Sequence, residues 1–445
     1  SASFRRDGSS TFGRDNRWGT FPSVAAAWSF SEENFVKDNL GWLSFGKFRV
    51  SWGRSGMHFS NNYLALGIMQ VGGSSYLGNS ILEPEWSEGL YNDELSWEET
   101  DQYDFGLDVD MFEHRLGITL DYYYRYTDKL LNKVDLPGRG RTTGYRKQWR
   151  NVAAVSNEGI EMMVKYEIFR KKDLFWKVSV NMARNWNRFE KSYTGVDING
   201  LIIGKSLNGI YALKTDGYVD YQSDVPVYFN QRGVKVPMSP RTNTTAYYKP
   251  GDYRFVDVNG DRKITTDDAV YCGSTLPELT GGIVSELRWK NFDVNLLMSF
   301  QLGRHMLDDT KTRALSSMSY LQYNALVMDL NEVSFWEKPG DNTDYPLYQM
   351  DNFSYQFYGA NVDRHVEKVN WLKIKTLTVG YSLPEKWIKK AGLSELRVFA
   401  SGENLYTFTN YSGVEPEVVD IRNGIDSGNA YPLARKLTLG LTLKF

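Results

Sequence analysis

Residues 116–126 read Leu-Gly-Ile-Thr-Leu-Asp-Tyr-Tyr-Tyr-Arg-Tyr, and they give the clearest structural signal in the sequence. Apolar or tyrosine side chains occupy every second position from Leu116 to Tyr126, and small or polar side chains occupy most of the others. A period of two indicates a β-strand, and its persistence over about eleven residues matches a tilted strand that crosses a bilayer. Tyrosines at one end suit a membrane–water boundary. The alternative is a long hairpin in a soluble sandwich, whose strands usually have nearer five or six residues.

The surrounding sequence predicts more strands of the same kind. Residues 95–131 form two long strands joined by a tight turn at 111–115, and further hairpins are expected at 156–189 and 280–302. The remaining strands are expected at residues 1–6, 20–30, 45–53, 369–383, 395–408 and 433–445. The total is about twelve strands, which is compatible with a membrane barrel.

The connections between these strands alternate between short and long. Long ones are expected at about residues 57–94, 129–151, 190–278, 303–367 and 409–431. Short turns on one side and long loops on the other are typical of an outer-membrane barrel. The sequence therefore predicts an all-β, antiparallel transmembrane β-barrel with long extracellular loops, whose last strand ends at the periplasmic side with Phe445.

Composition excludes several other classes. The net charge is −2 and no long basic run is present, so nucleic acid is not expected as a partner. The sequence contains no run of about eighteen apolar residues, so no transmembrane helix is predicted. The one cysteine, Cys272, allows no intrachain disulfide and is expected to be a small buried side chain. The sequence starts at Ser1 without a signal peptide, so we expect a processed chain or a piece of a longer one.

One local motif has the spacing of a metal site. Oxygen donors at Asp257, Asn259, Asp261, Lys263 and Asp268 occupy positions 1, 3, 5, 7 and 12 of a twelve-residue calcium loop, with Lys263 contributing its carbonyl. Calcium, in a structural role, is thus the expected cofactor. Position 6 carries an arginine instead of glycine, and position 12 an aspartate instead of glutamate. A turn closed by Asx hydrogen bonds is the alternative.

Other residue patterns give no catalytic site. The four histidines show no metal-ligand spacing, and no nucleophile or base accompanies the carboxylates near residue 100, so an enzyme is not expected. The long loops carry many aromatic side chains, which either bind sugar rings or a partner protein, or pack on one another. These are Tyr211, Tyr218, Tyr221, Tyr228, Phe229, Tyr320, Tyr323, Trp336, Tyr345 and Tyr348.

Motifs spread over nearly the whole chain resemble the C-terminal part of SusC/RagA-type TonB-dependent outer-membrane transporters. They include residues 5–10, Phe21-Pro22-Ser23, Trp97-Glu98, Asp121, Tyr123, Asp257 to Ile264, Gly281-Gly282, Asn404-Leu405, Pro416-Glu417, Tyr431-Pro432 and the terminal Phe445. Each is weak alone, and their order and spacing carry the resemblance.

The resemblance implies a location in the outer membrane of a Bacteroidota-like Gram-negative cell. It also implies a barrel of roughly twenty-two strands with a plug in its lumen, of which these twelve are the C-terminal portion. Two unpaired edges are not viable in lipid, so the remaining strands and the plug are expected from the same or another chain. The terminal alternation of leucines up to Phe445 resembles an assembly signal for membrane insertion.

The resemblance further implies a function. The expected function is TonB-dependent import of oligomeric nutrients, glycans or oligopeptides, with a SusD-like surface lipoprotein as the lid and TonB acting through the missing N-terminal part. The loops after residues 190 and 303 are the candidate contacts for that lid. The alternative is a soluble extracellular carbohydrate-binding β-protein with a dockerin-like calcium loop.

Overall fold

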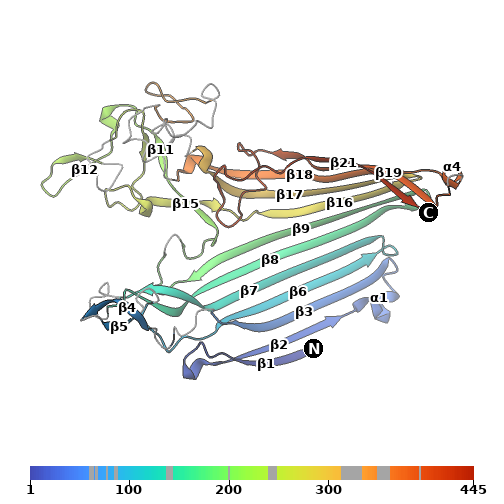
Figure 1. Cartoon of the computed structure of the whole chain (residues 1–445), viewed down its shortest axis with the longest axis horizontal. Coiled ribbons are helices and arrows are strands. Elements are labelled where there is room, and N and C mark those ends of the chain that lie inside the picture. Colours follow the sequence, from blue (N-terminus) through green and yellow to red (C-terminus); the bar gives the residue numbers. More distant parts are fainter. Residues whose placement is uncertain are drawn as a thin grey trace.

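The computed structural model describes residues 1–59, 65, 69–76, 79–84, 89–136, 144–198, 201–238, 248–311, 333–347, 361–389 and 392–445. One large antiparallel sheet dominates it (Figure 1). Its strands, in spatial order, are β1 (Ala2–Gly8), β2 (Trp18–Trp28), β3 (Leu43–Met57), β6 (Glu98–Met111), β7 (Leu116–Asp135), β8 (Lys147–Lys171), β9 (Leu174–Lys191), β16 (Leu279–Trp289), β17 (Phe292–Asp308), β18 (Val366–Ser382), β19 (Glu395–Thr409) and β21 (Lys436–Lys444). A short strand, β20 (Ile425–Asp426), pairs with β17 in parallel. The prediction of about twelve strands is confirmed.

The long strands lie side by side and the two kinds of connection separate to opposite ends of the sheet (Figure 1). We call these the turn end and the loop end. At the turn end, β6 and β7 are joined through Phe112, Glu113 and His114, which have φ values of 55°, 58° and 61°. The turn end also carries the short helices α1 (Asn34–Lys37) and α4 (Glu385–Ile388). No helix in the described ranges is long and apolar enough to cross a membrane.

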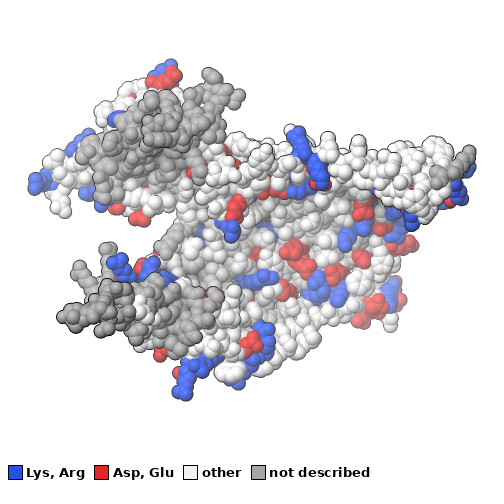
Figure 2. All heavy atoms as spheres, viewed as in Figure 1, with Lys and Arg blue, Asp and Glu red and all other residues white. Residues whose placement is uncertain are grey.

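Strand register gives the sheet an apolar face and a polar face. On the apolar face Leu107 lies opposite Leu120, and Phe105 opposite Tyr122. Such side chains remain exposed, with Leu439 86% accessible. On the polar face the Arg49 guanidinium lies 2.8 Å from Asp108 and 2.8 Å from Asp121. In Figure 2, charged side chains of both signs gather over the hollowed face of strands β6 to β9. An exposed apolar band of this extent requires lipid rather than water.

Two strands are longer than the sequence predicted. β7 runs on to Asp135 and β8 begins at Lys147, so ordered strand occupies much of the expected 129–151 loop. The register shifts near Leu130, and Lys129 has a φ of 57°. This bulge interrupts the period of two, which explains why the alternation ends before the strand does.

The connections after β9 and β17 fold together into a small domain at the loop end, which we call the loop domain. Three two-stranded antiparallel sheets build it: β10 (Gly209–Leu213) with β15 (Ala269–Ser274), β11 (Thr215–Tyr218) with β14 (Tyr253–Phe255), and β12 (Val227–Phe229) with β13 (Lys235–Pro237). It also contains the single-turn helices η4 (Gln222–Asp224), η5 (Thr266–Asp268) and η6 (Asp363–His365). Elsewhere lie η1 (Arg14–Asn16), η2 (Phe30–Glu32) and the hairpin of β4 (Met69–Tyr76) and β5 (Asn79–Pro84).

The loop domain has a hydrophobic core of its own, and some of the aromatic side chains predicted in the long loops pack in it. Tyr218, Trp336 and Tyr345 are buried in this core. Tyr221 and Phe229 are exposed. Tyr320, Tyr323 and Tyr348 lie outside the described residues. Packing of loop aromatics on one another therefore accounts for the buried members of the set.

Candidate functional site

Residues 411–426, which follow β19, fold back across the polar face of β17 and β18, and we call them the fold-back segment. Its strand β20 pairs with β17. Its Tyr411 and Val419 pack against Met306, Val369 and Trp371 of the sheet. These three sheet residues are apolar although they lie on the polar face, because the fold-back segment covers them.

Buried charges fix the fold-back segment to the sheet. Lys373 is 1% exposed, and its Nζ lies 2.9 Å from a carboxylate oxygen of Glu415 and 2.9 Å from one of Glu417. Lys375 also donates to Glu417. Burial acts to raise the pKa of Glu417, but hydrogen bonds from Lys375 and Lys373 outweigh it and hold the pKa below its ordinary value. A buried charge needs such partners, since desolvation is costly.

A second anchor lies nearer the loop end. Arg304 is 1% exposed and donates from one guanidinium nitrogen to the carbonyls of Val419 and Asp420, at 2.9 and 2.8 Å. The Tyr411 hydroxyl donates to Asp426 at 2.7 Å. The segment is therefore held at both ends by polar contacts and between them by apolar packing.

A cavity of about 390 Å³ lies between the fold-back segment, the end of β17 and the loop domain. It is lined by Asp308, Thr310, Lys311, Val333, Tyr345, Ser412, Gly413, Val414, Glu415, Val418, Asp426, Gly428, Ala430 and Pro432. A cavity of this size with mixed apolar and charged lining fits part of a small polar ligand or one residue of a longer chain.

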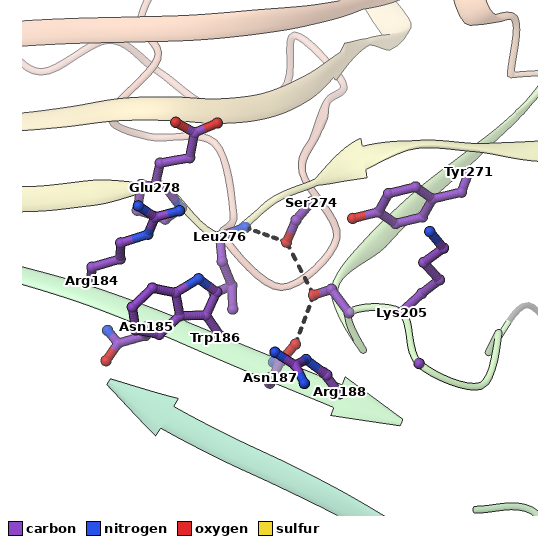
Figure 3. A pocket seen from close by; sticks show the side chains of 13 residues that line it. Arg184, Asn185, Trp186, Asn187, Arg188, Lys205, Tyr271, Ser274, Leu276 and Glu278 are labelled. Carbon is purple, nitrogen blue, oxygen red and sulfur yellow. Dashed lines mark hydrogen bonds between the residues drawn. The ribbon is translucent and has the colours of Figure 1, made fainter. Parts of the chain in front are cut away.

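A second cavity, of about 280 Å³, lies where β9 and β16 separate at the loop end, and we call it the rim pocket (Figure 3). Pairing between these strands reaches Ala183 and Thr280, and β9 continues to Lys191. Beyond that point the backbone of Phe189 bonds instead to Gly204 and Lys205. The side chain of Asn187 accepts from Ser206, which holds this loop beside the strand.

The predicted calcium loop is a compact turn. Asp257 accepts hydrogen bonds from the backbone of Gly260 and Arg262, and Asp268, fully buried, accepts from Val258, Asn259 and Thr265. Arg262 at position 6 has a φ of 71°, the conformation for which calcium loops use glycine. Within the described ranges, no three His, Cys, Asp or Glu side chains converge as metal ligands. The loop is thus closed by Asx hydrogen bonds in the described structure, and calcium binding stays a prediction.

Two other predicted residues can be placed. Phe445 follows β21 at the turn end and is 88% exposed. Most side chains of the edge strand β21 are also exposed. Cys272 is only half-buried, on β15 of the loop domain. The role of Phe445 in assembly stays a prediction.

The site residues that hold the fold-back segment were not predicted from sequence. Lys373 and Lys375 are two residues apart on one strand, and Glu415 and Glu417 are two residues apart in a distant loop. This shared two-residue spacing of the lysine pair and the glutamate pair is the signal in the sequence that could have indicated their contact. Nothing local in the sequence shows that they meet, because they lie about 42 positions apart.

A curved sheet with an exposed apolar face, a polar face and segregated connections defines a membrane-spanning β-barrel protein. Residues 1–269 match the family model described as TonB dependent receptor-like, beta-barrel, and the chain belongs to this family of outer-membrane proteins. The chain is 30% identical to TonB-dependent receptor P3 of Formosa agariphila, over 99% of this chain and 43% of that protein. It is 28% identical to TonB-dependent receptor SusC of Bacteroides thetaiotaomicron, over 99% of this chain and 41% of that protein.

The fold is also similar to a solved structure, that of the RagAB peptide transporter. The TM-score is 0.71 at 24% identity, and the match covers all of this chain and 45% of that one. The chain thus spans less than half the length of the relatives it matches. The family resemblance and the outer-membrane location are confirmed, and the alternative of a soluble two-sheet protein is wrong, because the strands form one sheet with an exposed apolar face.

Proposed function

We propose that this chain is the C-terminal portion of a barrel that imports oligomeric nutrients across the outer membrane. The observation that carries the proposal is the fold-back segment on the polar face, fixed by Lys373, Glu415 and Glu417. A rigid segment of this kind shapes the interior of a passage, whereas a structural barrel has no need of one. By likeness to SusC and the RagAB transporter, energy comes from TonB and a plug, which further sequence of the same or another chain supplies.

The loop domain is our candidate contact for a SusD-like surface lipoprotein that acts as a lid. It is built from the connections after β9 and β17, has its own core and exposes Tyr221 and Phe229. Exposed aromatic side chains on a rigid base suit protein recognition. The cargo is an oligomer of sugars or of amino acids, and both remain candidates.

Purification of the complete transporter from native outer membranes tests this proposal. We expect the chain to require detergent for extraction, to co-purify with a lipoprotein, and to carry an oligosaccharide or oligopeptide detectable by mass spectrometry. A double Tyr221→Ser and Phe229→Ser variant should lose the lipoprotein while the barrel still assembles. Recovery of the chain alone, without lipoprotein or bound oligomer, would contradict the proposal.

We also propose that the loop of residues 257–268 binds calcium in a structural role. The donors predicted from spacing lie in one compact turn, and Arg262 already has the backbone conformation that position 6 of such a loop needs. Calcium titration of the transporter, followed by thermal unfolding of the loop domain, should show stabilisation by calcium that Asp257→Ala together with Asp261→Ala removes. Equal calcium response in wild type and variant would eliminate the site.

A further inference from the structure

The rim pocket carries side chains of the apolar face at its border with the loop end. Arg184, Trp186 and Arg188 of β9 lie opposite Ile160, Glu158 and Ser156 of β8. The same register continues to Tyr122, whose hydroxyl donates to Glu158 on this face. Val180 and Met182 lie on this face next to Arg184, toward the turn end. These side chains therefore lie directly above the apolar band on the outer side of the wall, whereas Asn185 and Asn187, which also line the pocket, lie on the polar face.

The pocket has an excess of positive charge. Glu278 is paired with Lys368 at 2.7 Å, and Glu158 with Arg188 at 3.1 Å. Arg184 lies beside Glu278 in Figure 3, but among the described residues no carboxylate lies within ion-pair distance of Arg184 or Lys205.

Counted together, Arg184, Arg188, Lys205 and Lys368 give four cations against two carboxylates, a net charge of +2 (4 − 2). Both unpaired cations lie over aromatic rings that border the cavity. The Arg184 guanidinium is 4.8 Å from the Trp186 ring and the Lys205 ammonium 5.6 Å from the Tyr271 ring. Figure 3 shows the two cations on opposite sides of the space, with Ser274 between them. An arginine and a lysine in the lining of one pocket favour an anionic ligand, and arginine binds phosphate oxygens in a bidentate manner.

We propose that the rim pocket binds the phosphate group of a phosphorylated glycolipid in the outer leaflet of the membrane. Basic pockets on membrane-spanning surfaces recognise anionic lipid headgroups, and an indole at this height suits the interface. The acyl chains then lie along the apolar face beside Met182 and Val180. A soluble anion is the weaker choice, because in the proposed importer cargo passes along the polar face, and Arg184 and Arg188 lie on the other one. This inference rests on the proposed orientation, in which the loop end faces outward.

The test uses the complete transporter in nanodiscs that contain either a phosphorylated glycolipid or the same glycolipid after enzymatic dephosphorylation. Native mass spectrometry counts the retained lipid for wild type, for Arg184→Gln with Lys205→Gln, and for the charge-preserving Arg184→Lys with Lys205→Arg. A matched control, Lys172→Gln with Lys389→Gln, removes two exposed cations at the turn end. Glucose 1-phosphate provides a soluble phosphate ester as competitor.

We expect wild type and the control to bind the phosphorylated lipid at least tenfold more tightly than the dephosphorylated one. The glutamine variant should lose this preference, and the charge-preserving variant should keep most of it. Equal retention by wild type and the glutamine variant would overturn the proposal. Binding of glucose 1-phosphate as tightly as the lipid would also overturn it, in favour of a soluble ligand.

Nutrient uptake and lipoprotein co-purification by the glutamine variant separate this inference from the proposed function. Both should be unchanged relative to wild type, because Arg184 lies on the outer side of the wall and Lys205 belongs to a loop beside the end of β9. If uptake is normal but neither the wild type nor any variant prefers the phosphorylated lipid, the proposed lipid site is wrong and the proposed importer function stands. Loss of uptake together with lipid binding, with unchanged assembly, would contradict the separation of the pocket from the passage.

Discussion

The two halves of the polar face differ in how far their charged side chains are exposed to water. On β3, β6 and β7, Arg49 reaches Asp108 and Asp121 with its side chain 38% exposed. On β17 and β18, Lys373 and Arg304 are each 1% exposed because the fold-back segment covers them. Arg49 and Lys373 both have carboxylate partners, whereas Arg304 donates to the backbone carbonyls of Val419 and Asp420. An ion pair therefore has a larger effect on stability once a covering segment excludes water, since exposed pairs contribute little and breaking a buried pair costs much.

The largest effect should follow from Lys373→Ala. The change leaves the carboxylates of Glu415 and Glu417 half-buried with only Lys375 nearby, and breaking a buried pair costs about 3 kcal/mol. Hydrogen exchange of peptides from residues 411–426 should then accelerate at least a hundredfold, with strands β3 to β7 unaffected. Adding Glu415→Gln and Glu417→Gln in the same chain should restore much of the protection. Unchanged hydrogen exchange in Lys373→Ala would show that the fold-back segment stays on the sheet without the contacts of Lys373 to Glu415 and Glu417.

A pH effect of similar size is expected in the loop domain. His365 is 2% exposed, and burial, aided by the nearby cations Lys311 and Arg364, lowers its pKa to about 4. In a locally opened domain the imidazole regains an ordinary pKa near 6.5. The opened state therefore binds more protons between pH 6.5 and 4, so the closed state is destabilised as pH falls through that range, by about 3 kcal/mol at most.

Hydrogen exchange of residues 361–365 at several pH values, corrected for intrinsic rates, measures this loss. Above pH 6.5 the protection should be flat. His365→Gln should abolish the dependence, and His114→Gln, which changes an exposed histidine at the turn end, should leave it intact. If the protection of residues 361–365 depends on pH equally in both variants, titratable groups other than His365 cause the effect.

Tyr411→Phe should give a smaller effect on the covered half. It removes only the hydroxyl that donates to Asp426, a hydrogen bond to a charged group worth about 2 kcal/mol. The ring stays packed on Met306 and Trp371, so the segment should loosen near residue 426 and not near Glu415. Uniform loosening along the segment would show that the two anchors act as one.

The smallest effect should come from Arg49→Gln on the open half. The ion pairs with Asp108 and Asp121 remain hydrated and are worth at most about 1 kcal/mol. Thermal unfolding in detergent should change by no more than a few degrees, and less at high salt. A loss as large as that of Lys373→Ala would mean that this half of the polar face is also covered in the complete protein.

Sequence reasoning predicted the open half better than the covered one. Alternation such as that of residues 116–126 is a local property, so strand positions and the single sheet followed from it. The fold-back segment depends on contacts between positions far apart, and its apolar sheet partners, Val369 and Trp371, break the alternation of β18. The loop domain escaped prediction for the same reason, since its short strands pair across long stretches of sequence and are stabilised by a shared core rather than by their own pattern.

In a membrane barrel, alternate residues of each long strand face lipid and the barrel interior. Spin labels at single cysteines replacing Ile118, Thr119 and Leu120, in a Cys272→Ser background, test it in lipid bilayers. Collision with oxygen, which concentrates in lipid, should be high at positions 118 and 120 and low at 119, with the reverse order for a water-soluble nickel chelate. Equal accessibility of all three positions to the nickel chelate would contradict the account.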